Sequence, residues 1–202
     1  MPMRMREIMN LTEAAGRSLV VVDVQPAYAN SIDFAPDLMR YVNAYRGPVL
    51  LLVNAEETDV SDDTKEEIAY YWQENGLKRQ KLARCTVIDK GYGYLRSWME
   101  YTDEETILFT IRFMVANNIH DSRDIEARTG TPLAELLADH SYDENMEDDP
   151  LVVNWLDAEM VRQTCQNCLL CGGGRHECLE EVRLMFEALG VRYTLLNEFI
   201  YG

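Results

Sequence analysis

Two continuous apolar runs near the N-terminus constrain the fold more than any other feature of this chain. Residues 18–24 read SLVVVDV and residues 48–55 read PVLLLVNA, and Gly16 and Gly47 precede them. Such runs are typical of strands that are buried on both faces of a sheet. The segment 36–45 between them has the apolar spacing of a short helix. This strand–helix–strand order predicts a parallel, right-handed βαβ unit.

The rest of the chain continues the alternation of strands and helices. The apolar patterns predict strands at 83–89, 167–171 and 191–201, and helices at 62–75, 157–166 and 178–189. Gly190 is placed to end the last helix. The segment 106–115 is compatible with a strand or a helix, and the acidic segment 141–150 is predicted to be a solvated loop. We therefore expect one α/β domain over residues 1–202, with a mostly parallel sheet and an insertion or lid around 103–150.

Charge and cysteine content limit the partners and the compartment. The 202 residues include 19 Lys and Arg against 35 Asp and Glu, a formal net charge of −16. A surface this acidic repels phosphate backbones and anionic lipids, so we expect neither nucleic acid nor a membrane as a partner. No run approaches the roughly 18 apolar residues that cross a bilayer, and the N-terminus lacks the apolar region of a signal peptide. The odd count of 5 cysteines fits a reducing compartment, so we expect a cytoplasmic protein.

Three residues with complementary chemistry follow the carboxyl ends of predicted strands. Asp23, Lys90 and Cys178 follow the first, third and fourth strands, and Cys178 also begins a helix. In open α/β sheets, ligands bind at this edge. The first turn of a helix favours a thiolate at Cys178. Asp23 is placed to take the thiol proton, and Lys90 to hold that carboxylate or the thiolate.

A Gly-rich turn, Gly172 to Gly174, leads into Cys178. It lets backbone amides around Glu177 and Cys178 approach a substrate and bind the oxyanion of an attacked carbonyl. Each site residue also has an ordinary structural interpretation. A cysteine in a first helical turn is often a small buried hydrophobe, an Asp at a strand end often caps a turn, and a Lys there is often solvated. Their occurrence together at one edge is what favours a functional site.

Three segments occur in an order that resembles a known enzyme family. VVVDVQPAY at 20–28, VIDKGYGYL at 87–95 and LLCGGGRHECLEEV at 169–182 are similar to the signature segments of the isochorismatase-like cysteine hydrolases. That family shows an Asp-x-Gln strand end, a Lys beside an aromatic-rich turn, and a Gly-rich loop that ends in a nucleophilic Cys. The resemblance covers about 1–100 and 150–202 in layout. It implies a three-layer α/β/α fold of Rossmann-like topology, a roughly six-stranded, mostly parallel sheet, and a homo-oligomer.

The resemblance also implies an activity, the cleavage of a C–N bond in a small-molecule, amide-type substrate through a covalent thioester. Residue by residue, it implies Asp23 as general base, Lys90 as the cation of the triad and Cys178 as nucleophile. The implied oxyanion or substrate loop comprises Gly173, Gly174, Arg175, His176 and Glu177, and the other implied substrate-binding residues are Gln25, Tyr28 and Tyr92. Neither a cofactor nor a metal is expected.

The sequence also departs from the family pattern. Arg175, His176 and Glu177 stand where the family has small or hydroxylated residues, and the chain ends soon after its last predicted strand. The segment VNAEETDVSDD at 53–63 lacks the His of the metal cluster found in the nicotinamidase branch, so that activity is not expected. These departures, with the large acidic insertion, support an alternative function: a non-catalytic binding or assembly module on the same fold.

Three other patterns suggest binding sites, but each lacks a required feature. Cys165, Cys168, Cys171 and Cys178 have the spacing C-x2-C-x2-C-x6-C. They span a helix end, a strand and a new helix, so their side chains are expected to diverge rather than hold a metal. The acidic run 143–149 lacks the ligand spacing and the Gly of an EF-hand loop. The loop GGGRHE lacks the Lys-Ser/Thr pair of a phosphate-binding loop, and its His176 is expected at the surface.

Overall fold

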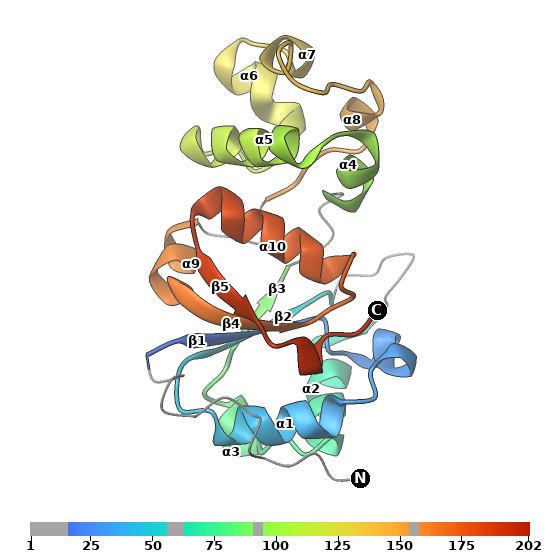
Figure 1. The fold of residues 1–202 in the computed structure, drawn as a ribbon, viewed down its shortest axis with the longest axis vertical. Coiled ribbons are helices and arrows are strands. Elements are labelled where there is room, and N and C mark those ends of the chain that lie inside the picture. The colour runs from blue at the N-terminus through green and yellow to red at the C-terminus, as the bar shows by residue number, and fades with distance from the viewer. Residues whose placement is uncertain (1–15, 56–62, 91–94, 154–157) are drawn as a thin grey trace.

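The computed structural model describes residues 16–55, 63–90, 95–153 and 158–202. Its centre is a five-stranded, all-parallel sheet with the strand order β3-β2-β1-β4-β5. The strands are β1 (Ser18–Val22), β2 (Val49–Val53), β3 (Thr86–Asp89), β4 (Asn167–Gly172) and β5 (Arg192–Leu195). Helices lie on both faces of this sheet (Figure 1). The prediction of an α/β fold with a parallel sheet is confirmed.

Alternating side chains along the central strands divide the core into two halves. In β1, Leu19 and Val21 belong to one apolar cluster, and Val20 and Val22 belong to the other. Every residue of β1 and β2 is buried. Because both faces of these strands are covered, their sequences read as continuous apolar runs instead of an apolar–polar alternation.

One face of the sheet packs against helices from the first half of the chain. These are η1 (Pro26–Ser31), α1 (Ala35–Ala44), α2 (Lys65–Glu74) and α3 (Arg79–Leu82) (Figure 1). α2 begins with a capping box, in which Thr64 and Glu67 each accept a hydrogen bond from the other's backbone amide. Trp72 of α2 donates its indole N–H to Val24 O at 2.6 Å. This bond holds α2 against the segment that follows β1.

The opposite face packs against α10 (Cys178–Leu189), with α9 (Ala158–Thr164) beside it (Figure 1). Leu179, Val182 and Phe186 of α10 are buried in this half of the core. The helix has the bounds that its sequence predicts, and Gly190 ends it with a φ of 71°. The left-handed conformation at this position explains the glycine.

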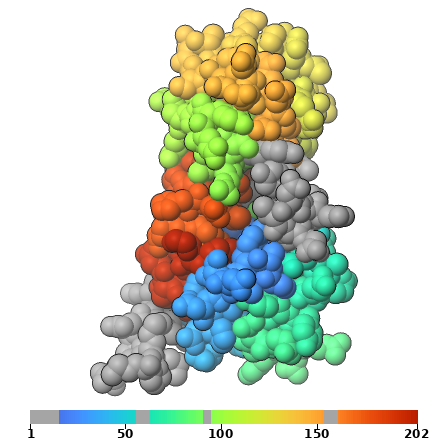
Figure 2. All heavy atoms as spheres, turned by 90° about the vertical axis from the view of Figure 1, so that its right-hand side faces the viewer, coloured from blue at the N-terminus to red at the C-terminus, as the bar shows by residue number. Residues whose placement is uncertain are grey.

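Between β3 and α9, residues 95–153 form a helical segment that lies beyond α10 from the sheet and makes up one end of the molecule (Figures 1 and 2). It contains α4 (Leu95–Tyr101), α5 (Glu104–Ala116), η2 (Ser122–Asp124), α6 (Ile125–Thr129), α7 (Leu133–Leu136) and α8 (Asn145–Asp148). α5 packs along α10. Trp98 Nε1 donates to Asp149 O and Tyr101 donates its hydroxyl to Asp149 Oδ2, each at 2.7 Å, which ties α4 to the segment after α8.

Two expectations from the sequence need correction, and one segment that the sequence left open is assigned. The described part of the chain contains five strands in its sheet, not six. The segment 106–115, which the sequence left open, lies in α5; the helix packs along α10, and the Asp103 side chain caps its start by accepting a hydrogen bond from Thr106 N. The predicted solvated loop at 141–150 contains α8, which contacts α4, and Met146 is fully buried, since its side chain belongs to the larger apolar cluster of the core.

None of the helices in the described ranges combines the length and the apolar character that a bilayer crossing requires.

Candidate active site

Asp23, Lys90 and Cys178 lie together at the carboxyl edge of the sheet. Lys90 Nζ is 3.1 Å from Asp23 Oδ2, and the two side chains are 6% and 0% exposed. β2 separates β1 from β3, so Lys90 extends across the end of β2 to reach Asp23. Cys178, the first residue of α10, interacts electrostatically with both charges. A carboxylate, an ammonium group and a thiol therefore share one largely buried site.

The backbone at Asp23 has an unusual conformation. Its φ is 44°, in the left-handed region that non-glycine residues rarely occupy and that Asp tolerates better than most. Within the described part of the chain, neither carboxylate oxygen has a partner with good hydrogen-bond geometry, but Lys90 and the Cys178 thiol both lie close enough to interact with this carboxylate. The ion pair with Lys90 is thus what balances this buried charge, and the oxygens keep capacity for a proton or for a donor group on a ligand.

Glycines bring the loop after β4 against the end of β1. Gly172 and Gly173 have φ of 80° and 57°. A Cβ on Gly172 would lie 2.2 Å from Val22 O, and one on Gly173 would lie 2.8 Å from Leu179 N. Gly173 N also donates to Val22 O at 2.6 Å. Only glycine permits this approach, which places the start of α10, and with it Cys178, beside Asp23.

The same loop determines which backbone amides have a backbone hydrogen-bond partner. Glu177 N and Leu179 N both donate to Gly174 O, at 3.1 and 3.2 Å. In the described ranges, the amides of His176 and Cys178 donate no hydrogen bond to another backbone group. Of the two amides expected to bind the oxyanion, that of Glu177 already has a partner within the turn. The amide of Cys178 is therefore the better candidate, together with that of His176.

The environment of Cys178 keeps its thiol protonated. Burial raises the pKa of the Cys178 thiol, the Asp23 carboxylate raises it further, and Lys90 opposes both; the pKa stays well above its ordinary value. Burial lowers the pKa of the Lys90 ammonium, but the charges of Asp23 and Glu181 outweigh this and raise it overall. The expectation of a resting thiolate is therefore wrong, because burial and a neighbouring anion outweigh the helix end and the lysine.

The predicted substrate-binding residues occupy different positions. Burial raises the pKa of Tyr28 to about 12, and Cys178 and Asp23 add to the effect, so this hydroxyl lies within reach of the triad's charges. Gln25 is fully buried and donates both amide hydrogens, to Asn54 O at 2.8 Å and to Asp63 Oδ2 at 3.0 Å. These bonds hold the segment after β1 in place. Tyr92 lies outside the described residues.

The predicted loop residues also differ in their contacts. Gly173 and Gly174 are buried, as the close backbone approach requires. Arg175 Nη1 donates to Asn197 Oδ1 at 3.2 Å, and a carboxylate oxygen of Glu177 lies 3.3 Å from Arg96 Nη2. His176 is exposed, as expected. The charged side chains of this loop thus contact residues of the rim.

Two residues of the site were not predicted from the sequence. Glu181 lies one helical turn after Cys178, and its Oε2 is 3.8 Å from Lys90 Nζ. The i, i+3 spacing on one helix face is a signal that sequence reasoning could have used. Tyr201 donates its hydroxyl to Asp23 O at 3.3 Å and stacks on Tyr28 with ring centroids 6.4 Å apart. No local sequence pattern predicts the contact between Tyr201 and Asp23, because the two residues are far apart in the sequence.

The other cysteines do not form a metal site. All five thiols are free. Cys168 and Cys171 are buried on opposite faces of β4, in the two separate apolar clusters. Burial raises the pKa of Cys165 to about 11 and that of Cys168 to about 12. No group of three or more metal-ligating side chains occurs among the residues that the structure describes.

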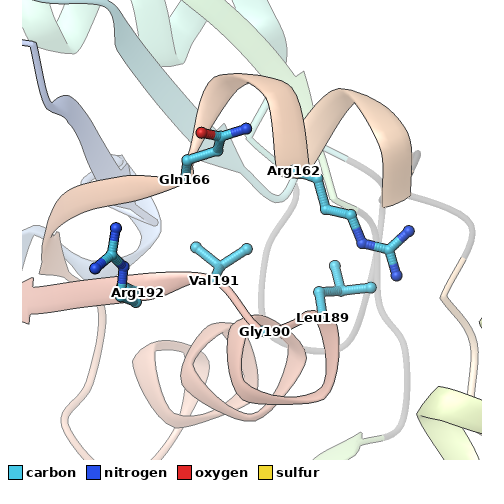
Figure 3. Close-up of a pocket in the computed structure, with 6 residues that line it drawn as sticks. All are labelled: Arg162, Gln166, Leu189, Gly190, Val191 and Arg192. Carbon is cyan, nitrogen blue, oxygen red and sulfur yellow. The ribbon is translucent and has the colours of Figure 1, made fainter.

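A separate pocket of about 330 Å³ lies at the opposite, amino edge of the sheet (Figure 3). It is lined by Arg162, Gln166, Leu189, Gly190, Val191 and Arg192, with the two arginine side chains on opposite sides of it. α9 ends at Thr164 and α10 at Leu189, so both helices direct their carbonyl ends to this region. Cations are favourable at such ends without any ligand. The pocket therefore does not compete with the carboxyl edge as the candidate active site.

No protein-family model, no curated protein and no solved structure matches this chain.

Proposed function

We propose that this protein is a cysteine hydrolase that cleaves a C–N bond of a small amide-type substrate. The observation that carries the proposal is the buried Asp23–Lys90 ion pair beside the Cys178 thiol, at the sheet edge where α/β proteins bind ligands. A fully buried carboxylate next to a nucleophile, held by an ion pair, is costly to maintain for structure alone. Perturbed, charge-coupled groups of this kind cluster at functional sites.

The first step is attack of sulfur on the substrate carbonyl. Cys178 gives its proton to Asp23 as the C–S bond forms, and the negative charge passes to the carbonyl oxygen, facing the Cys178 amide. Loss of the thiol proton to solvent would leave a thiolate in a buried site beside the Asp23 carboxylate; burial raises the thiol pKa most, and the charge of Asp23 raises it further. Internal transfer to Asp23 leaves the net charge around Lys90 unchanged. The raised pKa of the resting thiol is thus compatible with a nucleophile that is activated only during attack.

The remaining steps return the site to its starting state. Asp23 gives the proton to the leaving nitrogen, the C–N bond breaks, and an amine or ammonia departs from the thioester on Cys178. Water then attacks the thioester and gives a proton to Asp23. The C–S bond breaks, the acid leaves, and the proton returns to sulfur. Lys90 stays an ammonium throughout and holds whichever neighbour carries the negative charge.

The experiment that tests this function is a screen of small primary amides for ammonia release. We expect turnover that Cys178→Ala and Asp23→Asn each reduce by about 10³-fold or more. Cys85→Ser and Asp37→Asn are matched controls that change the same residue types away from the site, and they should retain activity. Full activity in Cys178→Ala would contradict the proposal. Mass spectrometry of the acid-quenched enzyme should show an acyl adduct on Cys178.

The raised pKa of the Cys178 thiol also favours a second candidate, a binding or assembly module that keeps the fold but performs no chemistry. In that case, members of the amide panel raise the melting temperature of the wild-type protein, but they release no ammonia and leave no adduct. An adduct on Cys178 together with ammonia release contradicts this second candidate.

A further inference from the structure

Glu181 is a second carboxyl group at the lysine of the triad. It lies on α10 one turn after Cys178, and its side chain is 15% exposed. Its Oε2 is 3.8 Å from Lys90 Nζ, on which Asp23 Oδ2 also converges at 3.1 Å. The backbone amide of Arg96, in the first turn of α4, hydrogen-bonds the Glu181 carboxyl group. Glu181 thus contacts the helical segment and Lys90 from the helix that carries the nucleophile.

We propose that Glu181 is a positioning residue that shares the Lys90 ammonium with Asp23, and so leaves the Asp23 carboxylate able to accept the Cys178 proton. The inference rests on the proposed function, because it assigns Asp23 the role of base. A lysine that paired with Asp23 alone would stabilise the carboxylate and make it a weaker base. A second carboxyl group that pairs with the same ammonium reduces that stabilisation.

The distances support this division of the lysine's charge. Coulomb attraction falls inversely with separation, so at 3.8 Å Glu181 attracts the ammonium with about four-fifths of the strength that Asp23 exerts at 3.1 Å. Both contacts are screened little by water, since the three side chains are 15% exposed or less. Burial raises the pKa of Glu181, whereas the charge of Lys90 lowers it, so the lysine is what favours the ionised form of this buried carboxyl group.

Several other titratable or charged groups face this cluster and affect its protonation. Besides Asp23, Lys90 and Cys178 they are Tyr28 from η1, Arg96 from α4, Glu177 from the Gly-rich loop and Tyr201 after η3. Only Glu181 and Asp23 place a carboxyl group within 4 Å of Lys90 Nζ in the described part of the chain. Glu180, the neighbouring residue, pairs instead with Arg183, and it therefore provides a matched control.

The test measures alkylation of Cys178 by iodoacetamide as a function of pH, in a Cys85→Ser background, resolved by peptide mass spectrometry. We expect Glu181→Gln to lower the alkylation midpoint by about half a pH unit or more, a change of about threefold in the thiolate fraction. The reason is that removal of the Glu181 anion favours the Cys178 thiolate, and that the Lys90 ammonium, no longer paired with Glu181, stabilises this thiolate more strongly. Glu180→Gln removes the same charge away from the site and should shift the midpoint by less than about 0.2 unit.

A second experiment tests whether Glu181 affects the Cys178 thiol through Lys90 or directly. In a Lys90→Met background, the shift caused by Glu181→Gln should fall to less than half. An equal shift in both backgrounds, or an unchanged or raised midpoint in Glu181→Gln alone, would overturn the proposal. If circular dichroism shows that Glu181→Gln does not fold, Glu181→Asp replaces it. Withdrawing the carboxylate by one methylene should give a smaller shift in the same direction, and no shift would overturn the proposal.

Hydrolysis provides an independent readout. In an active enzyme, Glu181→Gln should lower kcat with little change in KM, because Asp23, in direct contact with Lys90, loses more basicity than the thiol gains in acidity, while substrate contacts stay the same. Alkylation needs no substrate, so its shift can be found even if no amide is hydrolysed. A shift in the alkylation midpoint without any hydrolysis contradicts the proposed hydrolase but supports the sharing of Lys90 by Glu181 and Asp23. Hydrolysis without a shift supports the hydrolase and contradicts the sharing of Lys90.

Discussion

The carboxyl edge and the amino edge of the sheet both carry cations, but in different environments. At the carboxyl edge, Lys90 is buried between two carboxyl groups and beside a thiol. At the amino edge, Arg162 and Arg192 are exposed around an open pocket near the ends of α9 and α10. A buried cation requires specific partners, whereas an exposed one needs only water and a favourable helix end. The comparison therefore separates a buried, charge-coupled cluster, which we propose is catalytic, from exposed cations that need no ligand.

The largest difference between the edges should appear in stability. Lys90→Met leaves Asp23 buried without its cation and should destabilise the protein by about 3–5 kcal/mol. Arg162→Gln removes a cation from the last turn of α9 and should cost about 0.3–1 kcal/mol, and less at high salt. Urea unfolding of both variants measures the contrast. Equal losses would mean that the Asp23–Lys90 pair is no more important to folding than a surface charge.

The glycines of the two edges offer a second contrast. Gly172 and Gly190 both have left-handed backbones, with φ of 80° and 71°. A Cβ on Gly172 would lie 2.2 Å from Val22 O, but one on Gly190 would meet nothing within 4 Å. Gly190→Ala should cost about 1–2 kcal/mol from its backbone alone. Gly172→Ala adds about 1–3 kcal/mol from the clash. Thermal melts that rank Gly190→Ala as the more damaging change would contradict this account of the loop.

The smallest of these effects concerns the charges around Cys178. Asp23→Asn removes an anion and should lower the pH midpoint of Cys178 alkylation by about one unit, whereas Lys90→Met removes a cation and should raise it. The wild-type midpoint should lie above the ordinary cysteine value of about 8.5, since the pKa is raised. Shifts in the same direction for both variants would show that Cys178 does not sense these two charges. Cys165, buried in the core, serves as the internal control.

Local patterns were enough to predict the five described strands and four of the helices that cover the sheet. The apolar runs before Asp23 and in β2 are strands because they are covered on both faces, and the apolar spacing from Cys178 to Leu189 matched a helix with the same bounds. The position of Asp23, Lys90 and Cys178 at strand ends also followed from the sequence, because the carboxyl ends of parallel strands share one edge. These inferences need only the period of a pattern and the direction of the strands.

Tertiary packing decided what such patterns leave open. It made 106–115 a helix against α10, buried Met146 in a segment that looked solvated, and brought Glu181 and Tyr201 to the triad. It also set the protonation of Cys178, since burial and Asp23 outweigh the helix end that the sequence shows. The physical reason is that hydrophobic periodicity is a property of neighbouring residues. Desolvation and ion pairing depend instead on which distant segments meet, and in this protein they meet at Lys90.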